Sequence, residues 1–460
     1  MQKQKPKKNV FRRQFGRFGT DGIRGVANTE VTAELAMQVG KAAGAVFMKN
    51  NGAHRHRVII GKDTRESGYM IENAITSGFL AVGVDVLLTG PLPTPAIAML
   101  TVSMGCDIGV MISASHNPYA DNGIKIFGSD GHKLPDSVEA EIEQLVNSDL
   151  SEYAAQAGKL GRAERIHEVQ GRYVEFAKRT LPRNTNFENL KVVIDCANGA
   201  AHKVAPWVLR ELRADAIPIG IEPNGVNINQ KVGSTYPSTV AARVLTEAAD
   251  VGIALDGDAD RVIIVDEKGQ VVDGDQIIAA IATAMHEGKR LRGGVAVTVM
   301  SNLGLEHYLR DRDIKVTYTK VGDRHVNEAM QSLGYNLGGE QSGHIICSDY
   351  STTGDGLIAG LQALSILKKS GRPASEVFHC FDPIPQDLRN VLYREGTKPL
   401  EHLAVKRVIA KSERLLLGRG RLVVRESGTE SVIRIMAQGE NRAEIEEVVR
   451  SIAHAIEMTS

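Results

Sequence analysis

Three stretches of this chain repeat one order of elements: an apolar strand, a polar loop, a helix and a second strand. They are residues 56–90, 191–220 and 293–326. In the first stretch the expected helix carries an apolar stripe with helical periodicity, formed by Ile71, Ile75, Phe79 and Val82. Runs of β-branched residues that alternate with helical stretches are typical of buried strands in layered α/β structures. The pattern therefore predicts three similar α/β domains in series.

The C-terminal part of the chain has a different pattern. Residues 420–439 read as two strands around a tight loop, and residues 441–458 read as a helix with Asn441 as N-cap and Glu444 three positions later. These features predict a smaller α+β domain. At 460 residues the chain is also too long for a single core. We therefore expect a basic, disordered tail over residues 1–17. Four domains would follow it, over residues 18–165, 166–266, 267–383 and 384–460.

The composition argues against several classes of partner. Lys and Arg together number 55, as do Asp and Glu, so the chain has no overall charge to attract nucleic acid or an anionic membrane. No apolar run is as long as a membrane span, and the N-terminal residues lack the apolar core of a signal peptide. Four scattered cysteines without a C-x-x-C pair favour free thiols in a reducing compartment. We expect a cytoplasmic protein without a nucleic-acid or membrane partner.

An acidic loop separates two apolar runs in the second predicted domain. Asp256, Asp258 and Asp260 alternate along it, and three carboxylates this close repel one another unless a cation neutralises them. A solvated acidic turn is one alternative. An EF-hand is another, but Arg261 stands where that loop requires glycine, and strands rather than helices flank it. We interpret the loop as a Mg²⁺ site that a phosphate oxygen completes.

A serine follows an apolar strand in the first predicted domain. The strand is expected to end at Ile112, and Ser115 and His116 come at its carboxyl end, with Lys125 further along. Polar side chains that a rigid strand places there often do chemistry. The stretch lacks the G-x-S-x-G elbow of serine hydrolases. A phosphorylated Ser115 fits better: its oxygens would complete the Mg²⁺ shell of the aspartates, while Lys125 and arginines offset its remaining charge.

Two later loops carry groups that bind sugars and phosphates. Glu340 and Ser342 can hydrogen-bond sugar hydroxyls and His344 can carry a proton, although a glycine-rich turn with a structural histidine is the alternative. Residues 425–434 offer hydroxyls, backbone amides and two guanidinium groups, which together can cradle a phosphate. An ordinary hairpin with exposed arginines is the alternative there. The cradle would consist of Arg425, Ser427, Gly428, Thr429 and Arg434.

Together these loops resemble the α-D-phosphohexomutase superfamily. ISASHNP at 112–118 resembles its phosphoserine loop, DGDADR at 256–261 its metal loop, GEQSGH at 339–344 its sugar loop and RESGTESVIR at 425–434 its phosphate loop. The order and spacing agree over nearly the whole chain outside the basic tail. Further motifs are most similar to those of the bacterial amino-sugar members of the superfamily: FGTDGIRG, GKDTRESGYM, GPLPTPA, PNGVNIN, VDGDQI, KVGDRHV and TTGDG.

The resemblance implies a fold and an activity. The fold would be four domains around a central active-site cleft, the first three sharing one α/β architecture. The activity would be the interconversion of glucosamine 6-phosphate and glucosamine 1-phosphate through a phosphoserine and a sugar 1,6-bisphosphate, with Mg²⁺, supplying UDP-N-acetylglucosamine synthesis. The resemblance also implies a homodimer. A phosphoglucomutase or phosphomannomutase with the same mechanism is the nearest alternative, and a metal-dependent sugar phosphatase and a non-catalytic binding protein are others.

The resemblance also implies roles for individual residues. Ser115 would be the phosphoserine, which Arg261 steadies. The Mg²⁺ ligands would be phospho-Ser115, Asp256, Asp258 and Asp260. Glu340 and Ser342 would bind the sugar, and Arg425, Ser427, Gly428, Thr429 and Arg434 would hold the phosphate that is not reacting. The candidates for general acid and base are His116, Lys125, His344 and Arg24, the last in a stretch that otherwise reads as a turn before the first helix.

Two positions depart from the pattern of the superfamily. Ala259 stands where the metal loop usually has glycine, and Ser431 stands where proline commonly follows SGTE. Alanine tolerates a positive φ poorly, so the first departure affects the expected loop geometry. Neither departure removes a predicted ligand.

Overall fold

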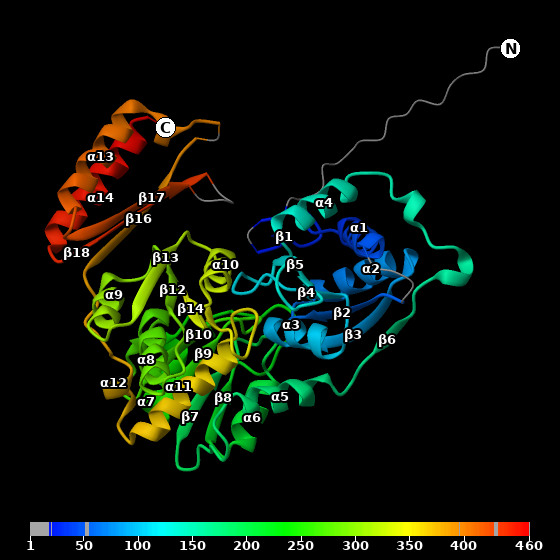
Figure 1. The fold of residues 1–460 in the computed structure, drawn as a ribbon, viewed down its shortest axis with the longest axis horizontal. Helices are drawn as coiled ribbons and strands as arrows, with labels where there is room; N and C mark the ends of the chain where they lie inside the picture. Colours follow the sequence, from blue (N-terminus) through cyan, green and yellow to red (C-terminus); the bar gives the residue numbers. More distant parts are fainter. Residues whose placement is uncertain (1–17, 20, 51–54, 395, 427–430, 460) are drawn as a thin grey trace. The chain divides into compact units, whose positions relative to one another are not determined.

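The computed structural model describes residues 18–19, 21–50, 55–394, 396–426 and 431–459. These residues form four separate β-sheets with helices packed on them (Figure 1). Contacts between residues divide the chain into two compact units. The first unit takes the chain up to Val169 together with Asn224–Ile228, and the second takes Gln170–Pro223 and the chain from Asn229 on. The predicted tail, residues 1–17, lies outside the described residues.

A six-stranded sheet forms the centre of the first unit. Its strands are β1 (Ile23–Val26), β2 (Arg57–Lys62), β3 (Asp85–Pro91), β4 (Ile108–Ile112), β5 (Asp121–Gly128) and β6 (Ala163–Arg165). They lie in the order β1-β5-β4-β2-β3-β6. Strands β4, β2, β3 and β6 are parallel, and β5 and then β1 extend the sheet with antiparallel pairings. The helices of this unit are α1 (Ala33–Asn50), α2 (Ser67–Ala81), α3 (Thr94–Ser103) and α4 (Asp136–Val146).

Strand β2, helix α2 and strand β3 confirm the order predicted for the first stretch. The predicted stripe on α2 is buried, and Ile71, Ile75 and Phe79 have no exposed surface. Helix α2 approaches α1 closely because glycines lie at the contact. A Cβ at Gly40 would lie 2.4 Å from the Ile75 carbonyl oxygen, and a Cβ at Gly78 would lie 2.3 Å from a carbonyl oxygen of α1.

Three further sheets belong to the second unit. The five-stranded sheet has the order β11-β10-β9-β7-β8 and consists of β7 (Lys191–Asp195), β8 (Asp215–Ile219), β9 (Val251–Leu255), β10 (Val262–Asp266) and β11 (Val271–Val272). The four-stranded sheet has the order β13-β12-β14-β15 and consists of β12 (Gly294–Thr298), β13 (Lys315–Thr319), β14 (Leu337–Gly339) and β15 (Ile345–Cys347). The three-stranded antiparallel sheet has the order β16-β18-β17 and consists of β16 (Gln386–Leu392), β17 (Gly420–Glu426) and β18 (Val432–Gly439).

The remaining helices connect and cover these sheets (Figure 1). They are α5 (Val169–Arg179), α6 (Val204–Glu211), α7 (Ser238–Glu247), α8 (Gly274–Glu287), α9 (Leu303–Arg310), α10 (Asp323–Leu333), α11 (Gly356–Ser370), α12 (Ala374–Val377), α13 (Leu403–Leu416) and α14 (Arg442–Glu457). Elements β7-α6-β8 and β12-α9-β13 confirm the second and third predicted repeats. At α14 the Asn441 side chain accepts a hydrogen bond from Glu444 N–H at 3.2 Å, which confirms the predicted N-cap. The fold class, three similar α/β domains and a smaller α+β domain, is confirmed, and the domain limits remain a prediction.

The first three sheets share a topology that places the candidate loops. In each sheet one parallel strand is followed along the chain by an antiparallel neighbour: β4 by β5, β9 by β10 and β14 by β15. The loop between each pair therefore leaves the carboxyl end of a parallel strand. In α/β sheets this is the end at which ligands bind.

All four cysteines are free thiols, as the sequence predicts. Burial raises the pKa of Cys106 and Cys380 to about 11 and that of Cys347 to about 12. Burial also raises the pKa of Cys196 well above its ordinary value. Near neutral pH these thiols are therefore protonated, which is the unreactive form.

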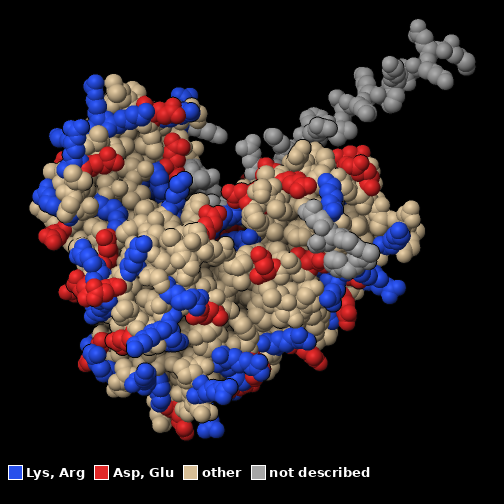
Figure 2. Space-filling model, in the orientation of Figure 1, with Lys and Arg blue, Asp and Glu red and all other residues tan. Residues whose placement is uncertain are grey.

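The surface carries both signs of charge. Figure 2 shows Lys and Arg interspersed with Asp and Glu over the face in view, in keeping with the equal totals of 55. Among the helices of the described ranges, none is both long and apolar enough to cross a membrane.

Candidate active site

Most predicted functional residues lie on the three loops between the paired strands. The β4–β5 loop contains Ser115 and His116, the β9–β10 loop contains the three aspartates, and the β14–β15 loop contains Glu340, Ser342 and His344. Three similar sheets thus present a hydroxyl, a carboxylate cluster and the predicted sugar-binding groups from topologically equivalent positions. The serine loop belongs to the first unit, and the other two loops belong to the second.

The serine loop holds Ser115 in an unusual backbone conformation. Ser115 is fully buried and left-handed, with a φ of 52°. Its backbone N–H donates to the hydroxyl oxygen of Ser113 at 2.9 Å. The Nδ1 atom of His116 lies 3.4 Å from the Ser115 hydroxyl oxygen. This pairing of a hydroxyl with an imidazole suits a nucleophile beside a proton carrier.

Asp21 pairs with three basic residues of the first unit. Its carboxylate forms ion pairs with Arg24, with Lys133 and with Lys125, whose Nζ lies 3.3 Å from Asp21 Oδ2. Arg24 lies on β1, which pairs with β5, so it belongs to the sheet and not to a turn before the first helix. Lys125 on β5 is buried. Sequence analysis missed Asp21 and Lys133, although the first lies within the quoted motif FGTDGIRG.

The three aspartates form a compact buried cluster. Asp256 and Asp258 have no exposed surface, and Asp260 is 2% exposed. Each offers one carboxylate oxygen, and these atoms lie within 4.8 Å of one another. The alternative of a solvated acidic turn is therefore wrong. Buried carboxylate oxygens at this spacing fit a hard divalent cation such as Mg²⁺.

Arg261 and Ala259 shape the metal loop. The backbone N–H of Arg261 donates to Asp256 Oδ1 at 3.2 Å, and its Nη1 donates to Asp256 Oδ2 at 3.1 Å. Ala259 adopts a φ of 58°, and its carbonyl oxygen accepts a hydrogen bond from Gly356 N–H at 3.0 Å. The alanine thus takes the left-handed conformation that glycine adopts more readily, and the carboxylate cluster is preserved.

His344 joins the metal loop to the β14–β15 loop. Its Nδ1 lies 3.7 Å from Asp260 Oδ2, and its Nε2 lies 3.6 Å from Asp323 Oδ2. Burial lowers the pKa of His344, but the two carboxylates raise it by more, so the pKa lies above its ordinary value. Nearby, Val262 N–H donates to the Gly343 carbonyl oxygen at 3.0 Å. The predicted proton carrier therefore lies beside the predicted metal ligands.

Glu340 and Ser342 lie in different surroundings on the same loop. A Glu340 carboxylate oxygen accepts a hydrogen bond from Gly322 N–H at 3.2 Å, and Ser342 is exposed. The carboxylate of Glu340 also partly offsets the lowering of the Arg425 pKa by burial and by Arg434.

Two arginines face each other on the β17–β18 hairpin. Arg425 lies directly opposite Arg434 across the strand pair. Burial lowers the pKa of Arg425, and the positive charge of Arg434 lowers it further. The Nε atoms of both arginines are buried and lack a hydrogen-bond partner within the described residues. Guanidinium groups with unused donors suit an anion. The other predicted cradle residues lie outside the described residues: Ser427, Gly428 and Thr429.

The TTGDG motif at 352–356 supports both loops of the second unit, a role that sequence analysis missed. Gly354 N–H donates to His344 Nε2 at 3.2 Å, and Gly356 N–H holds the metal loop as described above. Asp355 accepts hydrogen bonds from the Tyr173 hydroxyl at 2.9 and 3.0 Å. Resemblance was the only signal in the sequence that singled out this motif.

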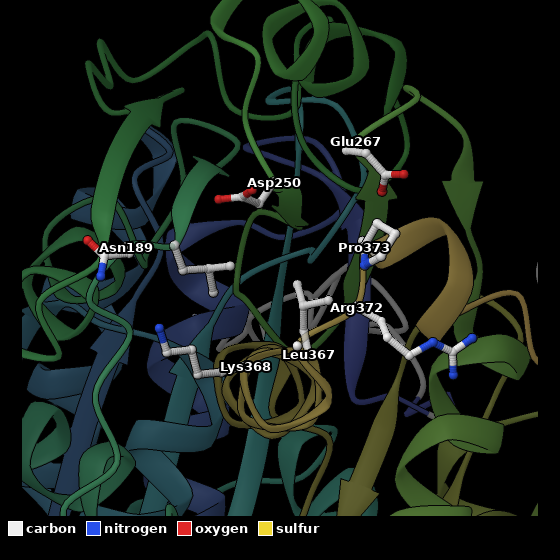
Figure 3. Close-up of a pocket in the computed structure, with 10 residues that line it drawn as sticks. Asn189, Asp250, Glu267, Leu367, Lys368, Arg372 and Pro373 are labelled. Carbon is white, nitrogen blue, oxygen red and sulfur yellow. The ribbon is translucent and has the colours of Figure 1, made fainter.

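A separate pocket of about 240 Å³ lies outside these loops, in the second unit (Figure 3). Its charged side chains already have hydrogen-bond partners within the protein, and they are Asp250, Glu267, Lys368 and Arg372. This pocket therefore does not compete with the loops as a candidate site.

Family models cover nearly the whole chain. The models of the phosphoglucomutase/phosphomannomutase α/β/α domains I, II and III match residues 16–152, 171–269 and 273–384. The model of the C-terminal domain of the same family matches residues 388–455.

Individual proteins give the same result. The phosphoglucosamine mutase of Azorhizobium caulinodans is 61% identical over 440 residues, which covers 95% of this chain and 98% of that protein. A phosphoglucomutase/phosphomannomutase family protein from Burkholderia thailandensis has the same fold, with a TM-score of 0.80, 21% identity and coverage of 97% of this chain and 98% of that one. The N-acetylphosphoglucosamine mutase of Aspergillus fumigatus, solved with GlcNAc-6P and magnesium, has a TM-score of 0.68, 18% identity and coverage of 97% and 96%.

The equivalent loops, the buried aspartates, the four family models and a relative of such high identity agree with one another. This chain belongs to the phosphoglucomutase/phosphomannomutase family, within the phosphohexomutase superfamily.

Proposed function

We propose that this chain is an isomerase that interconverts glucosamine 6-phosphate and glucosamine 1-phosphate, the step that supplies UDP-N-acetylglucosamine synthesis. One observation carries the proposal: three similar sheets present Ser115, the buried aspartates and the Glu340–His344 loop from equivalent positions. The high identity to a phosphoglucosamine mutase supports the amino sugar as substrate.

The reacting phosphoryl group is carried by Ser115 in this proposal. The bond from phosphorus to Ser115 Oγ breaks as a bond to the free hydroxyl oxygen of the sugar phosphate forms, which gives a bound sugar 1,6-bisphosphate. The other phosphate of this intermediate then returns to Ser115. The chemistry depends mainly on positioning and charge neutralisation.

Proton carriers accompany each transfer. His116, whose Nδ1 lies 3.4 Å from the Ser115 hydroxyl oxygen, exchanges the serine proton together with Lys125. Arg24 shares the carboxylate of Asp21 with Lys125 and adds positive charge for the phosphoryl group. His344 serves as proton carrier beside the metal loop.

Asp256, Asp258 and Asp260 hold Mg²⁺ in this proposal, since their carboxylates are buried and close together. Bound Mg²⁺ supplies positive charge that stabilises the transferring phosphoryl group. Arg261 holds Asp256 in place through two hydrogen bonds.

The substrate is held at its two ends. Arg425 and Arg434, whose buried Nε–H groups lack partners within the described ranges, bind the phosphate that is not reacting, together with Ser427, Gly428 and Thr429. Glu340 and Ser342 accept and donate hydrogen bonds to the sugar. We also propose a cytoplasmic location, in keeping with the free thiols. We further propose a homodimer, and light scattering tests this oligomeric state directly.

The experiment compares kcat/KM for glucosamine, glucose and mannose 6-phosphates, with Mg²⁺ and a trace of sugar 1,6-bisphosphate, while both isomer and free phosphate are measured. A strong preference for glucosamine 6-phosphate supports the proposal. Equal or better use of glucose or mannose reassigns the protein as a broader hexose mutase, and phosphate release without isomer points to a phosphatase. The matched variant Ser115→Ala should retain the fold and lose mutase turnover, and normal steady-state activity in it contradicts the phosphoserine.

A further inference from the structure

Arg65 is a fully buried arginine beside the serine loop, in the motif GKDTRESGYM. Its guanidinium Nε donates to Asp63 Oδ2 at 2.9 Å, and its backbone N–H donates to Asp63 Oδ1 at 2.9 Å. Both side chains have no exposed surface in this ion pair. Two charges buried this completely need several well-placed partners to offset their loss of hydration.

The remaining N–H groups of Arg65 bind the backbone of the serine loop. Nη2 donates to the carbonyl oxygens of Ser115 and Asn117, each at 2.9 Å, and Nη1 donates to that of Pro118. Only a guanidinium offers five donors in a rigid plane that can reach a carboxylate and several carbonyls at once. Arg65 therefore holds the segment that begins at the candidate phosphoserine through hydrogen bonds to its backbone.

Asp63 holds the same segment from its other side. Its Oδ2 accepts a hydrogen bond from the Ser113 hydroxyl at 2.6 Å, and the Ser113 oxygen in turn accepts one from Ser115 N–H at 2.9 Å. The Asp63–Arg65 pair is thus connected to both the N–H and the C=O of Ser115. This explains how a non-glycine residue stays at a φ of 52°, a conformation that is stable only when its surroundings fix it.

We propose that Asp63 and Arg65 are a positioning pair that fixes the backbone of Ser115 and so presents its hydroxyl, or its phosphoryl group, in a single place. Neither residue touches substrate in this proposal. The inference rests on the proposed function, because it gives a purpose to a fixed Ser115 only if that serine transfers a phosphoryl group. Such transfer depends on alignment of the donor oxygen, so a small displacement of the loop slows the reaction without weakening substrate binding.

Two variants test the pair. Arg65→Lys keeps a positive charge for Asp63 but cannot donate hydrogen bonds to all three carbonyl oxygens. Ser113→Ala removes one hydroxyl and, with it, the acceptor for Ser115 N–H. Thr101→Val is the matched control: its hydroxyl is equally buried and donates to Ile97 O at 2.7 Å, at the opposite end of β4. Melting temperature is measured for all three variants.

We expect Arg65→Lys to lower kcat on the order of 100-fold, since a misplacement of about 1 Å costs that much, with an unchanged KM for glucosamine 6-phosphate. Ser113→Ala should lower kcat in the same way but less, and Thr101→Val should retain it. Amide hydrogen exchange of residues 111–120 should be faster in both test variants and unchanged in the control.

The outcomes separate this inference from the function on which it rests. Wild-type kcat in a folded Arg65→Lys protein overturns it, and if that variant does not fold, wild-type kcat in Ser113→Ala does so. A rise in KM at constant kcat also overturns it, because the pair would then act on substrate binding. If the wild-type protein forms no isomer, and mass spectrometry finds no phosphate on Ser115 after incubation with glucose 1,6-bisphosphate, the proposed function fails and this inference falls with it.

Discussion

Two non-glycine residues in the candidate loops, Ser115 and Ala259, adopt a left-handed backbone and are fully buried. Left-handed conformations of non-glycine residues cluster where the surroundings of a functional site impose them. At Ser115 the N–H donates a hydrogen bond to the Ser113 hydroxyl oxygen, and the carbonyl oxygen accepts one from Arg65. At Ala259 they include Gly356, whose N–H binds the alanine carbonyl oxygen. The backbone of Gly356 therefore helps to hold the metal loop in this conformation.

Gly356→Ala should damage the metal loop. A Cβ at Gly356 would lie 2.2 Å from the Arg261 carbonyl oxygen, so the loop must move, at a cost of roughly 1–3 kcal/mol. We expect a lower melting temperature and weaker Mg²⁺ binding, measured by isothermal titration calorimetry. Gly360→Ala on the same helix α11 is the control: its Cβ would meet no atom closer than 3.5 Å, and alanine stabilises a helix interior by about 0.5–1 kcal/mol. Equal Mg²⁺ affinity in the two variants would contradict this account.

The sequence reveals side chains that carry chemistry more readily than those that hold them. The loop positions of Ser115 and the three aspartates were predictable because these polar residues directly follow buried apolar strands, and their roles remain a proposal. The contacts of Arg65 were not predictable, because it binds backbone carbonyl oxygens, which every residue type has. The nearest of these carbonyls in the chain is 50 residues away. Asp21 escaped notice for a similar reason, since the lysines that it pairs with lie on and beyond a different strand.

In the β17–β18 hairpin, two positively charged side chains repel each other. Arg425 and Arg434 lie opposite each other, and like charges in this position destabilise a strand pair by roughly 0.2–1 kcal/mol. A bound phosphate would reverse this effect, because it accepts hydrogen bonds from both guanidinium groups. The hairpin is therefore less stable without an anion than with one bound, as expected of an anion-binding site.

Arg425→Gln should stabilise the free protein and weaken substrate binding. Removal of one charge relieves the repulsion, whereas loss of a charge-assisted hydrogen bond worth about 1.5–3 kcal/mol should raise KM roughly 10- to 100-fold. Thermal unfolding without ligand and steady-state kinetics measure the two effects. Arg389→Gln, on β16 of the same sheet and 3.8 Å from Glu457, is the control and should leave KM unchanged. A lower melting temperature and an unchanged KM in Arg425→Gln would show that Arg425 is a structural residue.

Local patterns predict elements better than they predict pairing. The repeated strands and helices and the N-cap at Asn441 followed from periodicity and residue type alone. Strand β1 did not, because its four residues, Ile23–Val26, follow a turn-rich stretch and become a strand only through pairing with β5. The antiparallel direction of β5, β10 and β15 is local by contrast, because a short loop joins each of them to the strand before it. That direction makes the three candidate loops equivalent.

For the molecule as a whole, the 55 acidic side chains include carboxyl groups that keep a proton at mildly acidic pH. Burial raises the pKa of Glu139, Asp275 and Asp355 to about 7. Between the pKa of an unfolded carboxyl and about pH 7, the folded chain therefore binds protons that the unfolded chain has lost. These groups make the folded state more stable at mildly acidic pH and less stable as the pH rises.

Asp275 allows a direct test of this pH dependence. Its pKa is raised by burial first and by the charge of Asp273 second, and Asn302 N–H donates to its carboxylate at 2.7 Å. Asp275→Asn keeps an acceptor for that bond but cannot ionise. We expect wild-type stability to fall by about 2–3 kcal/mol more than that of the variant between pH 5 and pH 8, measured by urea unfolding. The exposed Asp311→Asn should follow the wild type, and identical pH profiles for wild type and Asp275→Asn would contradict the raised pKa.

Mg²⁺ should stabilise the whole chain through the same kind of linkage. A cation that binds only the folded aspartate cluster adds about 2.7 kcal/mol at one hundred times its Kd. We expect the melting temperature to rise with Mg²⁺ and to return to its starting value with EDTA. Asp258→Asn should abolish the rise in melting temperature. Asp215 is exposed on β8, in the sheet that carries the aspartate loop, and Asp215→Asn should retain the rise. A rise of equal size in Asp258→Asn would place the stabilising cation elsewhere.

The four unreactive thiols have a practical consequence for spectroscopy. Because burial keeps Cys106, Cys196, Cys347 and Cys380 protonated, maleimide and nitroxide reagents should modify the native protein slowly. A single cysteine introduced at an exposed position would then react almost alone. One such label in each of the two units would report the distance between them, free and with substrate, without prior removal of any natural cysteine.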